Sequence, residues 1–155
     1  MTKPTYYITT PIYYPSDNLH IGHAYCTTIA DTLARYHRLK GEDVWFLTGS
    51  DEHGLKIQRK AKEKGVTPIQ YVDAIIANFK LLWERLHISN NDFLRTSQER
   101  HHKVVQDALQ KIYEQGDIYK KNYKGLYCVP CESYWLERQL DENHCCPDCH
   151  RPVEE

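Results

Sequence analysis

The chain has 155 residues, of which 41% are hydrophobic and 26% are charged, and this balance suits one folded domain, or one domain with a small appendage. Its formal net charge of −1, from 20 Lys and Arg against 21 Asp and Glu, excludes a strongly basic protein that coats DNA but leaves a local RNA-binding patch open. No long apolar stretch follows Met1 or occurs elsewhere, so we expect a cytoplasmic protein without a signal peptide or membrane span. In such a protein, six cysteines indicate metal ligation and not disulfides.

The first 50 residues show strand, helix and strand patterns in that order. Residues 6–10 are β-branched and aromatic and precede two prolines, which predicts a strand followed by a loop. Apolar residues then recur at helical spacing from about His20, and Gly41 is expected to end this helix. Residues 44–48 are almost continuously apolar, which favours a strand covered on both faces. This order is a βαβ unit, and it predicts a parallel sheet.

Three further helices and a short strand are predicted between residue 51 and Gly116. A short helix ends at Gly65, and the next begins at Thr67, with proline in its first turn and Gln70 placed to complete a capping box. The apolar stripe of that second helix is interpreted as core packing: Ile69, Val72, Ile75, Ile76, Phe79, Leu82, Trp83 and Leu86. A strand is expected at residues 93–94, and then a helix capped by Thr96. The inward residues of this last helix are expected to be Val104, Val105, Ala108, Leu109 and Ile112.

The character of the sequence changes after Gly116, so we divide the chain into two units, residues 1–116 and 117–155. The second unit holds five of the six cysteines and little helical periodicity. Its two CxxC pairs have the spacing of a closed structural zinc site made by four thiolates: Cys128, Cys131, Cys146 and Cys149. Cys145 is a surplus thiol that could replace Cys146 as a ligand.

The predicted fold class is therefore α/β. We expect the first half of a doubly wound parallel, Rossmann-like nucleotide-binding domain, with a small zinc knuckle inserted after it.

The run His20-Ile21-Gly22-His23 lies directly after the first predicted strand and loop, where a helix is expected to begin. Free N–H groups and a positive partial charge at a helix start attract anions, and histidines three residues apart project from one face. Gly22 has no side chain, so a phosphate or a flat base could approach the backbone there. Two imidazole donors could stabilise charge that develops on a phosphate under attack. The alternative, two surface histidines without a role, fits this context less well.

Asp51 follows the second predicted strand, within Asp51-Glu52-His53-Gly54. Because ligands of open parallel sheets bind at the carboxyl ends of the strands, this motif and the histidine motif are expected at the same edge. Asp51 could hold the ammonium group of a ligand there, or it could only satisfy backbone donors in an Asx-turn.

Several runs of residues resemble the bacterial methionyl-tRNA synthetases. The main ones are residues 7–15 (Tyr-Ile-Thr-Thr-Pro-Ile-Tyr-Tyr-Pro), 20–25 (His-Ile-Gly-His-Ala-Tyr) and 48–54 (Thr-Gly-Ser-Asp-Glu-His-Gly). The likeness continues at residues 89–93 and 115–119, and it covers essentially the whole chain in order. The histidine motif alone marks only the class I synthetases and related nucleotidyltransferases, whereas the flanking residues make the methionine assignment more specific.

The resemblance implies an enzyme that joins methionine to ATP, giving methionyl-adenylate and pyrophosphate, and then passes methionine to the 3′ end of its tRNA. ATP would be used with magnesium. By similarity, His20 and His23 would be the catalytic residues that contact the ATP phosphates, and Gly22 would lie beneath the adenosine.

The resemblance also implies a methionine pocket and a metal site. Asp51 would hold the α-ammonium group of methionine, while Ile12 and Tyr14 would line its pocket. The four cysteines match the zinc-binding form of the family's inserted connective segment.

One departure from the family pattern affects the expected activity. The family's second signature, Lys-Met-Ser-Lys-Ser, is absent, because Met1 is the sole methionine. We therefore expect the remainder of the polypeptide beyond Glu155, and weak or no activity from this chain alone. Two alternatives stay open: another class I synthetase or nucleotidyltransferase, and a non-catalytic zinc module that binds RNA or protein.

Overall fold

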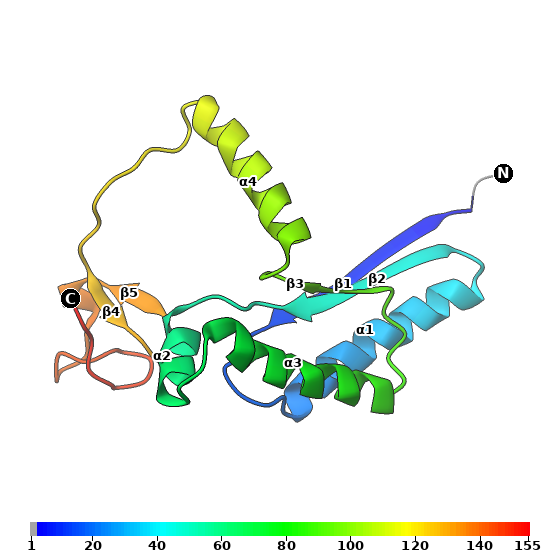
Figure 1. The fold of residues 1–155 in the computed structure, drawn as a ribbon, viewed down its shortest axis with the longest axis horizontal. Coiled ribbons are helices and arrows are strands. Elements are labelled where there is room, and N and C mark those ends of the chain that lie inside the picture. Colours follow the sequence, from blue (N-terminus) through cyan, green and yellow to red (C-terminus); the bar gives the residue numbers. More distant parts are fainter. Residues whose placement is uncertain (1–2) are drawn as a thin grey trace.

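The structure, a computed structural model, describes residues 3–155. Two sheets and four α-helices make up this part of the chain (Figure 1). In chain order the elements are β1 (Thr5–Tyr13), α1 (Ile21–Leu39), β2 (Asp43–Ser50), α2 (Leu55–Glu63), α3 (Pro68–Arg85), β3 (Asp92–Arg95), α4 (Glu99–Glu114), β4 (Leu126–Cys128), β5 (Ser133–Trp135) and the 3₁₀ turn η1 (Glu137–Gln139).

The first sheet is parallel and has the strand order β1-β2-β3, which confirms the predicted α/β class. Figure 1 shows α1, α2 and α3 on one side of this sheet, whereas α4 projects away from the other side. No helix of residues 3–155 is both long and apolar enough to cross a membrane.

Only one face of the first half of strand β2 is covered within the described residues, whereas Thr48, Gly49 and Ser50 at its end are all buried. Val44 and Phe46 are buried, but Trp45 between them is 52% exposed, and Tyr7 of β1 is 62% exposed. The expectation that residues 44–48 are covered on both faces therefore fails at Trp45, although Leu47 is half-buried and Thr48 is buried. The continuous apolar run has two apolar faces, but only one meets helices in this part of the chain.

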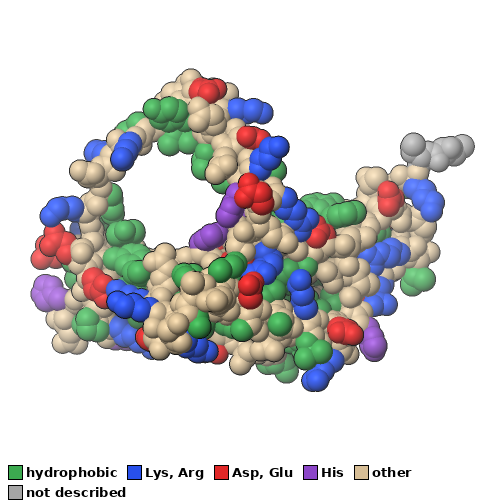
Figure 2. Space-filling view, viewed as in Figure 1, with side chains coloured by type: hydrophobic (Ala, Val, Ile, Leu, Met, Phe, Trp, Pro, Cys, Tyr) green, Lys and Arg blue, Asp and Glu red, His purple; other side chains and the backbone are tan. Residues whose placement is uncertain are grey.

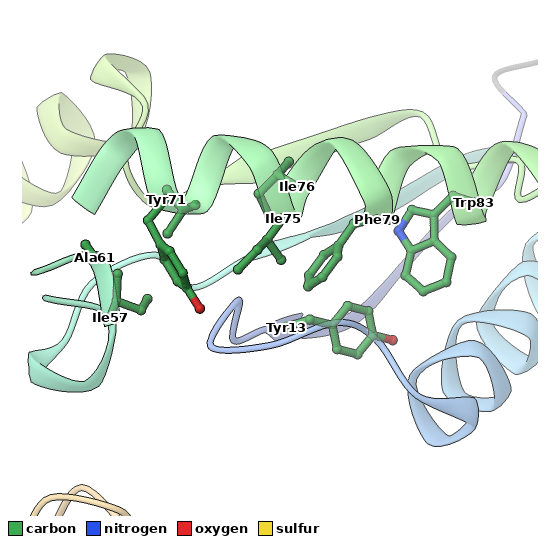
Figure 3. Packing of buried hydrophobic residues seen from close by; sticks show 9 residues of the cluster. Tyr13, Ile57, Ala61, Tyr71, Ile75, Ile76, Phe79 and Trp83 are labelled. Carbon is green, nitrogen blue, oxygen red and sulfur yellow. The ribbon is translucent and has the colours of Figure 1, made fainter. Parts of the chain in front are cut away.

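The main core forms where α3 meets α2 and the end of β1 (Figure 3). The Thr67 and Gln70 side chains form the predicted capping box at the start of α3, which directs one stripe of the helix inward. Five residues of the predicted stripe are buried, whereas Ile69 and Leu86, at its two ends, are 46% and 41% exposed. The core cluster comprises Tyr13, Ile57, Ala61, Tyr71, Val72, Ile75, Ile76, Phe79 and Trp83.

Shortening a core side chain of α3 should destabilise the fold strongly. Phe79 is 1% exposed, so Phe79→Ala is expected to lower the free energy of unfolding by about 3–5 kcal/mol, through lost burial and a cavity. Leu81→Ala, on the outer side of α3 with 44% exposure, should change it by only about 0.5 kcal/mol. Urea titrations followed by circular dichroism would measure both, and equal losses would contradict this packing.

Helix α1 packs through small and polar residues and not through its apolar stripe. Ala34 is fully buried and Ala30 is 6% exposed, and they pack against Val44 and Phe46 of β2. The carboxylate of Asp31, also buried, accepts hydrogen bonds from Ser89 and Arg35. The apolar residues at helical spacing are instead exposed: Ile21, Tyr25, Ile29, Leu33 and Tyr36.

Helix α4 has no buried residue, so the prediction that its apolar stripe turns inward is wrong. Val104 is 67% exposed and Leu109 is 51% exposed, because α4 projects from the sheet (Figure 1). Thr96 does not cap the helix, which begins after Gln98; its hydroxyl accepts a hydrogen bond from the Glu52 backbone instead. The helix ends before Gly116, whose φ of +85° is the left-handed stop expected there.

The chain after α4 returns across an opening that Figure 2 shows clearly, and it then forms the second sheet. Strands β4 and β5 are antiparallel, and Tyr127 of β4 also pairs with Glu154 near the end of the chain. The two CxxC segments lie at this small sheet and in the loops that follow it.

Candidate functional site

Strands β1 and β2 end side by side and bring the predicted methionine-pocket residues to one edge. Tyr13 pairs with Ser50, and the Asp51 backbone N–H donates to the Tyr13 carbonyl at 3.0 Å. The register shifts between Thr9 and Ile12, around Pro11, which has no N–H to give to the ladder. Ile12, 48% exposed, and the partly buried Tyr14 and Asp51 therefore lie together at the carboxyl edge.

The two histidines form a reciprocal cap at the start of α1. His20 is the N-cap residue, and its Nδ1 accepts a 3.1 Å hydrogen bond from the Gly22 backbone. The His20 backbone N–H in turn donates to Nδ1 of His23 at 3.0 Å, and the ring centroids are 3.9 Å apart. Because both Nδ1 atoms accept, each neutral ring carries its proton on Nε2. The capping geometry therefore leaves two Nε2–H donors for a ligand.

Gly22 is required by this cap. A Cβ at Gly22 would lie 2.9 Å from Cε1 of His20 and 3.0 Å from its Nδ1. A larger residue would therefore push the His20 ring away from the backbone N–H that it accepts.

The Tyr13 ring packs against the His23 ring and limits its movement. The sequence pattern did not predict this contact. The bulge at Pro11 turns Tyr13 inward, where it is 5% exposed, and its ring meets that of His23 edge-on at 5.1 Å. Its hydroxyl lies 2.6 Å from that of Thr27, one turn further along α1. Burial, followed by the charge of His20, lowers the pKa of His23, so His23 is neutral at pH 7.

A buried carboxylate ties the ends of β2 and β3 together and was also missed from the sequence. Glu52 is 4% exposed and accepts hydrogen bonds from Ser50 Oγ (2.5 Å), Ser97 Oγ (2.5 Å) and Arg95 Nε (2.7 Å). Arg95 also pairs with Asp73 of α3 at 2.5 Å. The only sign of this pair in the sequence was the position of Glu52 beside Asp51. Arg95, the cation that pairs with Glu52, lies 43 residues further along the chain.

Removing the Arg95 side chain should destabilise the fold far more than removing the side chain of Asp73, the exposed one of its two partners. Arg95→Ala would leave the fully buried Glu52 carboxylate without its cation, and the free energy of unfolding should fall by about 3–5 kcal/mol. Asp73→Ala removes only a carboxylate that is 53% exposed, and this should cost at most about 1 kcal/mol. Chemical denaturation of both variants would test the contrast; similar losses would show that the buried pair carries no special energy.

Four cysteine sulfurs converge in the second unit: those of Cys128, Cys131, Cys146 and Cys149. All four lie within 4.8 Å of one another, with 3.5 Å between Cys128 and Cys149 and 3.9 Å between Cys131 and Cys146. Zinc bound to thiolates at about 2.3 Å in a tetrahedron requires sulfurs roughly 3.8 Å apart. The donor set and its spacing therefore fit a zinc ion.

The thiols of this cluster differ in acidity. Burial raises the pKa of Cys146, but backbone N–H groups of Cys149 and Asp148 outweigh it, and the pKa falls to about 7. Hydrogen bonding with Cys149, together with burial, raises the pKa of Cys131 to about 12. A divalent cation would favour the thiolate at every position. Cys145 lies outside the cluster, with its sulfur 3.5 Å from the Asn143 carbonyl.

The parallel sheet, with helices packed against it and the start of α1 beside its carboxyl edge, defines an α/β domain of the Rossmann-like class. Comparison with known families makes this class specific. The chain belongs to the family "tRNA synthetases class I (M)", whose model matches residues 6–154.

Individual relatives support the resemblance to the methionyl-tRNA synthetases. The chain is 59% identical over 154 residues to the methionine–tRNA ligase of Clostridium perfringens, covering 99% of this chain and 24% of the relative. It is also 59% identical over 152 residues to that of Caldanaerobacter subterraneus, covering 98% of this chain and 24% of the relative. The chain thus spans about a quarter of the length of these relatives.

A solved structure agrees with the fold. Mycobacterium tuberculosis methionyl-tRNA synthetase, in complex with methionyl-adenylate, matches with a TM-score of 0.90 and 37% identity. The match covers 97% of this chain and 30% of the mycobacterial chain.

Proposed function

We propose that this chain is the nucleotide- and methionine-binding first part of a methionine–tRNA ligase. The observation that carries the proposal is the pair of Nε2–H donors at the start of α1, beside the edge where Ile12, Tyr14 and Asp51 gather. The reaction joins methionine to ATP with release of pyrophosphate, and methionine then passes to tRNA. Its support is the identity to ligases of this specificity.

Each residue of the edge has a role that its chemistry allows. Nε2–H of His20 and of His23 donates to phosphate oxygens and stabilises the charge that develops during attack by the methionine carboxylate. Gly22 leaves room for the adenosine at the same place. ATP enters as its magnesium complex, in which the metal neutralises part of the phosphate charge. No acid–base residue is required, because adenylation depends mainly on positioning and charge stabilisation.

The methionine pocket is formed at the ends of β1 and β2. The Asp51 carboxylate pairs with the α-ammonium group, while Ile12 and the Tyr14 ring line the side-chain pocket. Ile12 is 48% exposed, which leaves its apolar surface free for contact with the substrate.

The second unit, residues 117–155, holds a structural zinc ion on Cys128, Cys131, Cys146 and Cys149. Four thiolates leave no open position on zinc, so the ion would stabilise a segment too small to fold alone. The support for this proposal is the convergence of the four sulfurs.

This proposal extends to the apolar surfaces that are exposed within residues 3–155. Further polypeptide of the native protein would cover them. Strand β1 pairs only with β2 in this part of the chain, and α1 and α4 expose apolar stripes. The relatives have about four times the length of this chain, enough to add strands to β1. The family's Lys-Met-Ser-Lys-Ser signature would lie in that further part, and residues 1–155 alone would have weak or no activity. The complete enzyme would work in the cytoplasm, where tRNA is charged.

The test is amino-acid-dependent exchange of pyrophosphate into ATP by the native protein that carries this chain. Methionine should drive exchange, whereas isoleucine and leucine should not. Exchange driven by another amino acid would favour a different class I synthetase, and exchange without any amino acid would favour a nucleotidyltransferase. RNA binding without exchange would favour a non-catalytic zinc module.

A further inference from the structure

One residue at the end of β3 contacts the chain on both sides of Asp51. Thr96 directly follows β3, and its backbone N–H donates to the Ser50 carbonyl at 3.1 Å. Its hydroxyl accepts a 2.8 Å hydrogen bond from the Glu52 backbone N–H. Its carbonyl oxygen lies 3.3 Å from Nε2 of His53. Thr96 therefore binds the residue before Asp51 and the two residues after it.

The backbone of Asp51 is held from the opposite direction. Its N–H donates to the Tyr13 carbonyl at the end of β1 at 3.0 Å, so the segment is bound between the ends of β1 and β3. Thr96 is 8% exposed and Glu52 is 4% exposed, so water cannot readily replace the hydrogen bond between them. The backbone that carries the Asp51 carboxylate thus has partners on both sides.

The two adjacent carboxylates of this segment differ in their own partners. The buried carboxylate of Glu52 accepts hydrogen bonds from Ser50, Ser97 and Arg95. Among residues 3–155, the half-buried Asp51 has no hydrogen-bond partner for its carboxylate. A ligand ammonium group that reaches this edge would therefore find the charge of Glu52 occupied and that of Asp51 free.

We propose that Thr96 is a positioning residue, which holds the end of β2 so that the Asp51 carboxylate meets the ammonium group of methionine. The inference rests on the proposed function and deepens it. It concerns the ammonium group alone, and not the apolar pocket for the methionine side chain. Without the Thr96 hydroxyl, the Glu52 N–H is buried without a partner, which is costly. The segment then shifts toward another acceptor, and the Asp51 carboxylate moves with it.

The experiment is equilibrium dialysis of methionine, without ATP, against the native protein that carries this chain. Thr96→Val has nearly the same shape but no hydroxyl, and it should raise the Kd for methionine about tenfold, a part of what a hydrogen bond between charged groups contributes. Thr96→Ser keeps the hydroxyl and should restore most of the affinity. A melting curve of each variant shows that it is folded.

A series of ligands shows whether Thr96 acts through Asp51. Methioninol keeps the ammonium group but lacks the carboxylate, so Thr96→Val should weaken its binding by the same factor as that of methionine. Methylthiobutanoate, the analogue without the amino group, should bind the variant and the wild type equally. Thr96→Val should add nothing to the loss caused by Asp51→Asn, and the affinity for ATP should not change.

Ser89→Ala is the matched control, because it breaks a polar contact in the segment that leads into the other end of β3. The Ser89 hydroxyl donates to the Asp31 carboxylate at 2.5 Å, and its loss should lower stability but keep the wild-type Kd for methionine. The inference would be overturned by a wild-type Kd for methionine in Thr96→Val, by an equal loss for methylthiobutanoate, or by an equal loss in Ser89→Ala. Each of these results would leave the proposed function intact, whereas a wild-type protein that binds no methionine would overturn both.

Discussion

Cys128→Ser is expected to lower the zinc content of the native protein from about one ion per chain to a small fraction of that. Cys128 is fully buried, so no water or other side chain can readily take its place at the metal. A structural zinc ion contributes on the order of 10–16 kcal/mol to the folding of a small module, and losing it should unfold residues 117–155. Metal analysis after gel filtration would measure the zinc, and near-UV circular dichroism would follow the aromatic residues of the module.

Cys145→Ser is the matched control for this prediction. Cys145 adjoins a proposed ligand in sequence, but its sulfur contacts only the Asn143 carbonyl among the hydrogen-bonding partners of the described chain. The variant should keep its zinc and its near-UV spectrum. Loss of zinc from Cys145→Ser would show that this thiol is a ligand, and full zinc in Cys128→Ser would rule out the four-thiolate site.

The combined variant His20→Asn with His23→Gln should slow methionine-dependent pyrophosphate exchange by at least about 100-fold, since loss of one such donor costs 10²–10³ in rate. These replacements keep the helix start, because asparagine is a preferred N-cap residue and glutamine at the third helical position completes a capping box. They remove the two Nε2–H donors, whose positions the reciprocal cap fixes. Exchange assays at saturating ATP and methionine would measure the rate.

Two observations separate this effect from simple unfolding. Methionine affinity, measured without ATP, should stay close to that of the wild type, because Asp51 and Tyr14 belong to the neighbouring strand ends. The melting temperature should also change little, since the side chains that cap α1 are replaced by others that can do so. An unchanged exchange rate would remove the histidines from the proposed mechanism.

Local interactions explain which features were predictable from the sequence. The capping box of Thr67 and Gln70 and the helix ends at Gly41 and Gly116 appear where they were expected, because each depends on residues a few positions apart. The parallel order of β1 and β2 follows from one helix between two strands. The CxxC pairs were also recognisable from the local sequence, since the two cysteines of each pair are three residues apart. The roles of the histidines, Asp51 and the cysteines stay predictions.

Helical periodicity did not predict which part of the protein packs against each apolar stripe. It correctly marked the stripes of α1 and α4 as apolar, but neither is buried within residues 3–155. In α1 the buried side is made by Ala30, Ala34 and Asp31 instead. A repeat of 3.6 residues shows which side chains share a face, whereas the neighbour of that face is set by the topology.

The sequence by itself determined the class of fold, the family and the set of candidate ligands, because motifs and turn signals are encoded over short distances. Only the tertiary structure decided which of two adjacent cysteines faces the cluster, that a bulge turns Tyr13 inward beneath His23, and that Glu52 meets Arg95. It also decided that Glu132 reaches Tyr14, 118 residues away. Such pairs are formed by the packing of separate elements, and no local pattern in either segment specifies the partner.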